Sequence, residues 1–196
     1  MRMLSALLAL CSTAAFGYND HANWSAYRGG YGQSYQFTTG AEAMQSTVTT
    51  ADSAESTSYR GLGLKTAMGV ELMKFVRFDA YHLYQDTSAN LSNSLRGDEL
   101  GGDIKLSFYG PVVNVTFGLG LFGSSLVNQT PQTSVRYYGQ GYTGLLGLER
   151  FLSPMVSIMV EAEGKKQSLK AENTEVTTKP EVNTVGLSLN LVLWLN

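Results

Sequence analysis

Charged residues of both signs recur within stretches of the chain that are otherwise apolar. Glu161 and Glu163 lie two residues apart, so in an extended chain their carboxylates share one face, where such a pair could share a proton or bind a cation. Unpaired charges in a confined interior are costly, so we expect mixed charges on neighbouring strands to form one network. Its predicted members are Lys65, Glu71, Arg77, Asp79, Asp103, Lys105, Glu149, Glu161 and Glu163.

Of the two histidines, His82 is the better candidate for chemistry. A histidine with a serine and a carboxylate could catalyse acyl transfer, but neither partner is evident from the spacing around residues 78–84. No His, Cys and Asp cluster has metal-ligand spacing, and Gly118 and Gly120 alternate as strand residues do rather than forming a phosphate-binding loop. We therefore predict no catalytic, cofactor-binding or metal-binding residue, no cofactor and no enzyme.

The composition indicates a folded chain of one domain. It has 196 residues, of which 43% are hydrophobic and 15% charged, with a formal net charge of −2. This apolar content and low net charge exclude an intrinsically disordered chain. The 14 Lys and Arg against 16 Asp and Glu give no basic footprint for nucleic acid. A single cysteine excludes a disulfide framework.

The first 17 residues have the features of an export signal. Arg2 precedes a short apolar run, and Ala15 and Gly17 place small residues three and one positions before Tyr18. The run is too short to span a bilayer, and Leu10 is too bulky to precede a lipid-bearing Cys11. We predict a cleaved signal peptide at 1–17, an N-terminal segment at 18–29 and one barrel domain at 30–196.

Beyond residue 30 the dominant period of apolar residues is two, the period of β-strands. The alternating stretches lie near residues 31–39, 61–72, 76–80, 100–108, 113–121, 146–149, 156–163 and 185–196. Tight turns are expected at residues 73–74, 110–111 and 152–154. Longer polar loops are expected at residues 40–57, 87–94, 127–132 and 171–178, and the first of these includes Glu42. The fold class predicted is an all-β, eight-stranded, antiparallel up-and-down barrel.

Alternation alone leaves open which face of the barrel meets water. In a soluble lipocalin-like barrel the apolar face points inward, whereas in an outer-membrane barrel it meets lipid and the lumen is polar. Long apolar faces almost free of charge favour the membrane barrel, in which an eight-stranded lumen is just wide enough for side chains to fill it. Aromatics near strand ends suggest girdles at the two interfaces. They are Phe75, Phe108, Tyr109, Phe151 and Trp194 at one end and Tyr59, Tyr81, Tyr84, Tyr137 and Tyr138 at the other.

An export signal, eight alternating strands, and tight turns opposite long loops together resemble the small outer-membrane β-barrels of the OmpA/OmpX kind. The resemblance covers residues 30–196 and implies an outer membrane of the Gram-negative type, with long loops outside. It implies outer-membrane lipids, including lipopolysaccharide, and the barrel assembly machinery as partners. In that family the last strand usually ends in an aromatic residue that this machinery reads, whereas here Trp194 lies two residues before the end.

We therefore predict a monomeric barrel in the outer membrane with a structural or surface-interaction role and a lumen filled by polar side chains. The exposed loops are the expected interaction sites, because binding specificity usually lies in loops on a rigid scaffold. Two alternatives remain: an outer-membrane lipid-modifying enzyme centred on His82, and a soluble periplasmic lipocalin-like barrel with an apolar ligand.

Overall fold

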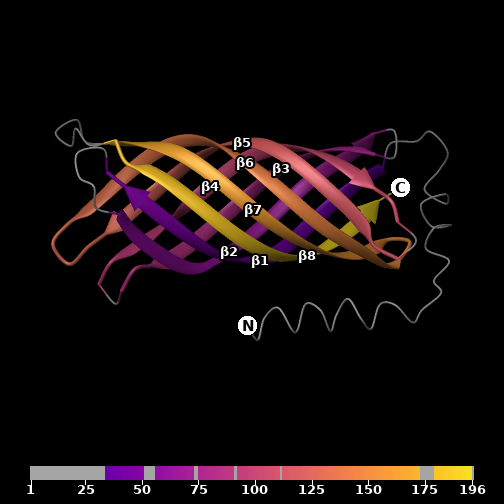
Figure 1. Ribbon diagram of the computed structural model, residues 1–196, viewed down its shortest axis with the longest axis horizontal. Helices are drawn as coiled ribbons and strands as arrows, with labels where there is room; N and C mark the ends of the chain where they lie inside the picture. Colours follow the sequence, from indigo (N-terminus) through magenta and orange to yellow (C-terminus); the bar gives the residue numbers. More distant parts are fainter. Residues whose placement is uncertain are drawn as a thin grey trace.

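The computed structural model of the protein describes residues 34–50, 56–72, 75–90, 92–110, 112–172 and 179–195. Within these residues eight antiparallel strands close into one barrel in sequence order, as predicted (Figure 1). The predicted signal peptide and N-terminal segment lie outside the described residues. The strands are β1 (Ser34–Thr49), β2 (Ser56–Leu72), β3 (Val76–Ser88), β4 (Ser94–Phe108), β5 (Asn114–Gln129), β6 (Ser134–Ser153), β7 (Val156–Ala171) and β8 (Glu181–Leu195).

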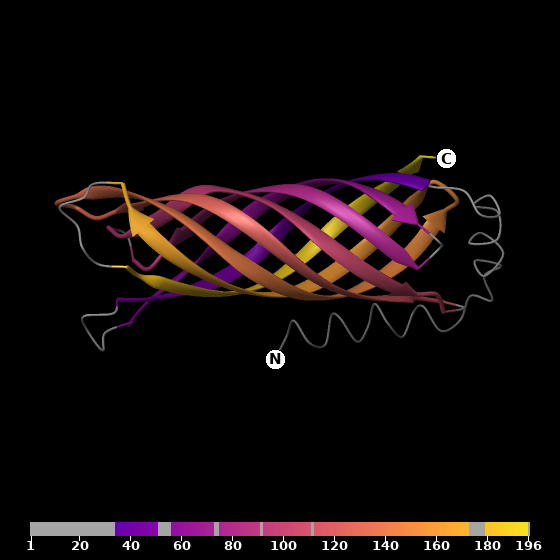
Figure 2. The ribbon, with the colours of Figure 1, turned by 90° about the horizontal axis from the view of Figure 1, so that it is seen from above.

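The barrel closes where β1 pairs with β8. The register runs from Tyr35 opposite Leu195 to Thr49 opposite Glu181, while the other edge of β1 pairs with β2. Every strand thus has two neighbours, so the backbone hydrogen bonds are satisfied within the sheet and no strand edge is left open. The strands tilt strongly against the barrel axis (Figure 2). No helix among the described residues is long and apolar enough to cross a bilayer.

The two faces of the sheet are opposite in character to those of a soluble barrel. Leucines point outward on every side of the barrel; Leu119, for example, is 73% exposed, whereas the guanidinium-bearing Arg77 inside is 0% exposed. An outer wall of this kind is stable against lipid and unfavourable against water. The structure therefore favours the membrane barrel over the lipocalin-like alternative.

The connections differ between the two ends of the barrel. The hairpin of β5 and β6 extends furthest at one end, and Thr130 closes its tip by donating its backbone N–H to the carbonyl oxygen of Thr133 at 2.8 Å (Figures 1 and 2). The C-terminus lies at the other end, where a tight turn at Pro154 and Met155 joins β6 to β7, later than the predicted turn at residues 152–154 because β6 continues to Ser153. We call these the long-loop end and the short-turn end.

The predicted loop at residues 40–57 is largely wrong, because β1 continues to Thr49 and β2 begins at Ser56. Its middle alternates small outward side chains, Ala41 and Ala43, with the inward side chains of Glu42 and Met44. Because alanine is only weakly hydrophobic, these outward residues do not produce the clear apolar–polar alternation that leucine or valine produces in the other strands. The backbone is nevertheless held in the sheet by pairing with β2 and β8.

The predicted aromatic girdles are confirmed only in part. Exposed outward aromatics are Phe75, Phe108, Tyr84 and Tyr138, as expected, whereas four others are buried in the lumen: Tyr59, Tyr81, Phe151 and Trp194. The correction follows from strand parity. Trp194 alternates with the outward Leu193 and Leu195, so its side chain must point inward although it lies at a strand end.

Candidate functional site in the barrel lumen

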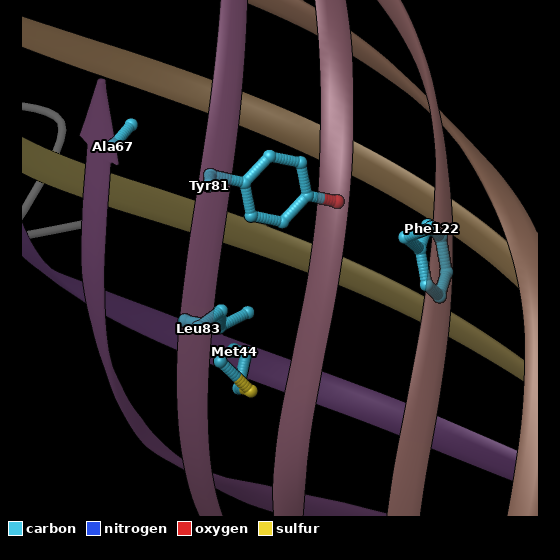
Figure 3. Packing of buried hydrophobic residues seen from close by; sticks show 5 residues of the cluster. All are labelled: Met44, Ala67, Tyr81, Leu83 and Phe122. Carbon is cyan, nitrogen blue, oxygen red and sulfur yellow. The ribbon is translucent and has the colours of Figure 1, made fainter.

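Apolar side chains fill the lumen towards both ends of the barrel. Near the long-loop end one cluster consists of Tyr59, Leu95, Leu126, Leu169 and Val182. Nearer the middle of the strands lies a second cluster of Met44, Ala67, Tyr81, Leu83 and Phe122, which extend inward from four strands (Figure 3). At the short-turn end a third cluster contains Phe151, Met159, Val192 and Trp194. The sequence predicted a wholly polar lumen, whereas the structure has apolar layers as well as polar ones.

Between the second and third apolar clusters, buried ion pairs follow one another along the lumen. The Lys105 amino group lies 2.6 Å from Glu161 Oε1 and 3.0 Å from Asp79 Oδ2. Arg77 continues the series, with Nε 3.3 Å from Asp79 Oδ2 and Nη1 3.9 Å from Glu149 Oε2. The series therefore alternates cation and anion as far as Glu149.

At its short-turn end, this series meets the third apolar cluster. The indole Nε1 of Trp194 lies 3.3 Å from Glu149 Oε1 and donates a hydrogen bond to Ser157 Oγ at 3.0 Å, and Ser157 Oγ donates to Glu149. Arg77 also contacts Met159, with Nη2 3.5 Å from the thioether sulfur. Polar and apolar layers are thus joined without a gap at this end.

Towards the long-loop end the alternation continues through two lysines. Lys65 lies 3.6 Å from Glu161 Oε2 and also pairs with Glu163. Lys165 lies 3.2 Å from Glu163 Oε2 and 3.1 Å from Glu99 Oε1. We call the whole series, from Lys165 to Glu149, the charge ladder.

Tyr81 of the second apolar cluster contacts two charged residues at this end of the ladder. The Tyr81 hydroxyl donates a hydrogen bond to Glu99 Oε1 at 2.7 Å, and the amino group of Lys65 lies 5.1 Å from the centre of the Tyr81 ring. Tyr81 thus bonds to a carboxylate through its hydroxyl and faces a cation with its ring, which a lipid-facing tyrosine could not do.

Among the described residues, buried carboxylates outnumber buried cations in the lumen by eight to four. Two of the carboxylates are poorly matched. Both oxygens of Glu42 lack a hydrogen-bond partner, with the nearest cation, Lys165, 3.8 Å away, and Asp103 Oδ1 also lacks one. Burial of a carboxylate without such partners is costly, so these positions are points of local instability in the network.

All nine predicted members of the charged network are buried in the lumen, which confirms the proposed face for each. Three further charged residues in the lumen were not predicted from the sequence: Glu42, assigned to a loop, and Glu99 and Lys165. The period of two that placed Glu161 and Glu163 extends to Lys165, so the signal for this residue was present. The alternating contacts favour the structural reading, in which side chains fill the interior and neutralise one another. No group of three or more metal-ligating side chains forms within the described part of the chain.

On the outer wall, His82 takes the outward position predicted for it. Its Nε2 atom lies 2.9 Å from Asp98 Oδ1, and both side chains are about half exposed. Asp98 is therefore the orienting carboxylate that spacing did not reveal, because it lies on the neighbouring strand β4. Within the described residues no hydrogen bond joins His82 to a serine or threonine hydroxyl, so the geometry supplies two members of an acyl-transfer triad and no nucleophile.

Comparison of the sequence with models of known protein families gives no match, and no curated protein matches it either. Comparison of the structure does give matches. The crystal structure of Neisserial surface protein A superposes with a TM-score of 0.60 at 16% identity, covering 80% of this chain and 96% of that one. The solid-state NMR structure of outer membrane protein AlkL in DMPC bilayers superposes with a TM-score of 0.53 at 10% identity, covering 86% and 93%.

At these identities the likeness concerns the fold. The chain has the fold of the small eight-stranded outer-membrane barrels, as the sequence resemblance implied. This fold, together with the apolar outer wall, supports location in the outer membrane.

Proposed function

We propose that this barrel is a closed, monomeric, non-catalytic scaffold that spans the outer membrane and displays its long-loop end for surface interactions. One observation carries the proposal: the charge ladder and the apolar clusters fill the lumen in successive layers, from Leu126 near one end to Trp194 near the other.

Closure follows from what an ion would have to displace. A hydrated ion entering from the long-loop end would first have to leave water for an apolar layer that contains Leu95 and Leu126, both at most 2% exposed. It would then have to separate buried pairs such as Lys105 and Glu161. Breaking a buried pair without a substitute partner costs several kcal/mol, on the order of 3–5 for each.

Display at the long-loop end is supported by polar residues on the outer wall. Arg96 pairs with Asp86 at 2.9 Å and Lys166 with Glu181 at 3.0 Å, all four of them outward-facing near the ends of their strands. Charged pairs are unfavourable in the hydrocarbon core, so these strand ends extend beyond it. Together with the long β5–β6 hairpin, they form a rigid base for exposed connections.

Conductance measurements test closure. The purified barrel is reconstituted into planar bilayers, and folding is verified in parallel by the shift in gel mobility between heated and unheated samples. We expect no stable conductance steps from the folded protein. Reproducible open channels would contradict the closed lumen.

Epitope insertion tests display. An epitope placed between Thr130 and Thr133 should bind antibody on intact cells, while the same epitope at Pro154 in the short turn should require permeabilised cells. The reverse pattern would place the long-loop end in the periplasm and contradict the proposal.

The enzyme alternative is tested at His82. Replacement by alanine, His82→Ala, should leave the lipid A profile of the cells unchanged, because no serine or threonine hydroxyl in the described part of the chain bonds to the imidazole. Loss of a lipid A modification in this variant alone, with Asp86→Ala as the outward-facing control, would favour catalysis over the scaffold role.

A further inference from the structure

A groove runs along the outer wall over β4, β5 and β6. Its volume is about 650 Å³, and the residues that line it are Leu100, Leu121, Phe122, Gly123, Gln140, Gly141 and Tyr142. The groove exists because Gly123 has no side chain at an outward position: a Cβ added there would have only the Gly139 carbonyl oxygen within 4 Å, at 3.8 Å. Because Leu100, Leu121 and Phe122 are among its lining residues, the floor and sides of the groove are mainly apolar, and the groove opens towards the surrounding lipid.

Gln140 contributes a polar side chain to the lining of this groove. Its side chain is outward and exposed, whereas further along the same face of β6 come Leu146 and Leu148. An amide in the hydrocarbon core would lack hydrogen-bond partners, so Gln140 indicates the level at which lipid headgroups begin. The groove thus extends from the headgroup level into the apolar part of the leaflet around the long-loop end.

Cations lie directly beside the groove. In the register of β6 with β7, Tyr142 is opposite Lys166 and Tyr138 is opposite Lys170. Arg136 lies two residues before Tyr138 on the same outward face. The nearby acids are Glu181, which pairs with Lys166 at 3.0 Å, and Glu172, which accepts a hydrogen bond from Tyr138 at 3.4 Å.

The two flanks of the groove differ in charge. On β3 and β4 the outward Arg96 is matched by Asp86, and His82 is matched by Asp98. At the long-loop end of β6 and β7 three outward cations, Arg136, Lys166 and Lys170, lie near two acids, Glu172 and Glu181, and within the described residues Lys170 has no acidic partner. A positive excess next to an apolar groove is complementary to a molecule with an anionic head and a hydrocarbon chain.

We infer that this wall binds one phosphate-bearing lipid of the surrounding leaflet. One acyl chain lies in the groove over Gly123, the phosphate lies against Lys166 and Lys170, and Gln140 bonds to the polar head. The inference depends on the barrel lying in a membrane and not on whether its lumen is closed.

The charge of the wall argues against a second copy of the chain as the occupant. A two-fold symmetric dimer through this face would bring the same cations, Lys166 and Lys170, towards their own counterparts. A phosphate instead supplies the opposite charge.

Native mass spectrometry of the detergent-purified barrel tests the inference, with a bisphosphorylated lipid A as the probe and its dephosphorylated form for comparison. Two changes remove one feature each: Lys166→Ala with Lys170→Ala removes the charge, and Gly123→Leu fills the groove. The matched controls are Arg60→Ala and Ala43→Leu, which make the same kinds of change at outward positions on β2 and β1. Heat-dependent gel mobility verifies that every variant is folded.

We expect one phosphorylated lipid per wild-type barrel, retained at least about tenfold more strongly than the dephosphorylated form, a difference of ~1.4 kcal/mol. Both test changes should lower retention by a similar factor, and both controls should leave it unchanged. Equal retention of the two lipids, or retention in either test variant that equals its control, would overturn the inference. A dimer in place of the lipid-bound monomer would overturn it as well.

Discussion

The amino group of Lys105 lies 2.6 Å from Glu161 Oε1, and both side chains are fully enclosed by the barrel. The two residues come from β4 and β7, which are not neighbours in the sheet. The contact therefore crosses the lumen and ties opposite walls together. Charges buried in this way stabilise only while each keeps its partner, since a lone buried charge is expensive.

Replacing Lys105 with methionine should accordingly be strongly destabilising. Lys105→Met keeps the length of the side chain but leaves Glu161 and Asp79 without their shared cation, and we expect the free energy of unfolding to fall by about 3–5 kcal/mol. Urea titration of the protein in lipid vesicles measures the change. Adding Glu161→Gln should recover part of the loss, because it removes a carboxylate that has lost the nearer of its two cations; strictly additive losses would contradict a coupled pair.

Glu42 should behave in the opposite way. Its two carboxylate oxygens have no hydrogen-bond partner, and Lys165, at 3.8 Å, is shared with Glu99 and Glu163. We expect Glu42→Gln to raise the free energy of unfolding at neutral pH by about 1 kcal/mol, because it removes an unmatched buried charge. Glu163→Gln is the matched control and should lower it, since Glu163 pairs with both Lys65 and Lys165. Destabilisation by both changes would show that the Glu42 carboxylate stabilises the ladder through its charge, as Glu163 does.

The sequence predicted the barrel and its inner face well because strand parity is a local property. A period of two assigns each residue to one face, and all nine predicted charges were assigned correctly in this way. Parity was lost where the outward residues are small, as at Ala41 and Ala43, and so Glu42 was placed in a loop. At Trp194 the prediction set strand parity aside: the preference of tryptophan for membrane interfaces placed this side chain in the outer girdle, although the alternation with Leu193 and Leu195 points it inward.

Partners across the lumen could not be predicted in the same way. Lys105 and Glu161 are 56 residues apart, and their contact depends on the stagger of every strand between them. The same holds for His82 and Asp98, which meet only in the register of β3 with β4. The apolar clusters were missed for a related reason: inward leucines such as Leu95 and Leu126 come from different strands and become a layer only when the barrel closes.

Two glycines provide a matched test of how tightly the lumen is filled. A Cβ added at Gly120, on the lumen face of β5, would lie 2.7 Å from the backbone carbonyl oxygen of Gly102 and 2.8 Å from Thr143 Cγ2, whereas one added at Gly164 would point outward with nothing within 4 Å. Gly120→Ala should therefore lower the free energy of unfolding by about 1–3 kcal/mol through overpacking. Gly164→Ala should be neutral or stabilising by less than about 1 kcal/mol, because it only restricts the unfolded chain. Equal effects in vesicle unfolding experiments would indicate an interior with room to spare.

The inward direction of Trp194 gives a spectroscopic prediction. Trp194 is 1% exposed, its indole N–H bonds to Ser157, and its ring centre lies 5.8 Å from that of Phe151. The chain has two tryptophans, so in Trp24→Phe selectively excited tryptophan emission comes from Trp194 alone. In vesicles of brominated lipids, whose bromine atoms quench tryptophan on contact, this emission should be almost unquenched because the sheet separates the indole from lipid.

The control for this measurement is a tryptophan on the outer wall at the same end of the barrel. Phe108 is outward and 60% exposed, so Phe108→Trp in a chain that also carries Trp24→Phe and Trp194→Phe should be quenched strongly. Trp194→Phe itself should cost only about 1 kcal/mol, the value of the lost hydrogen bond, whereas Trp194→Ala should cost about 3–5 kcal/mol because it opens a cavity in the third apolar cluster. Strong quenching of Trp194 would mean that its side chain lies in the interfacial girdle and that the third apolar cluster does not close the short-turn end of the lumen.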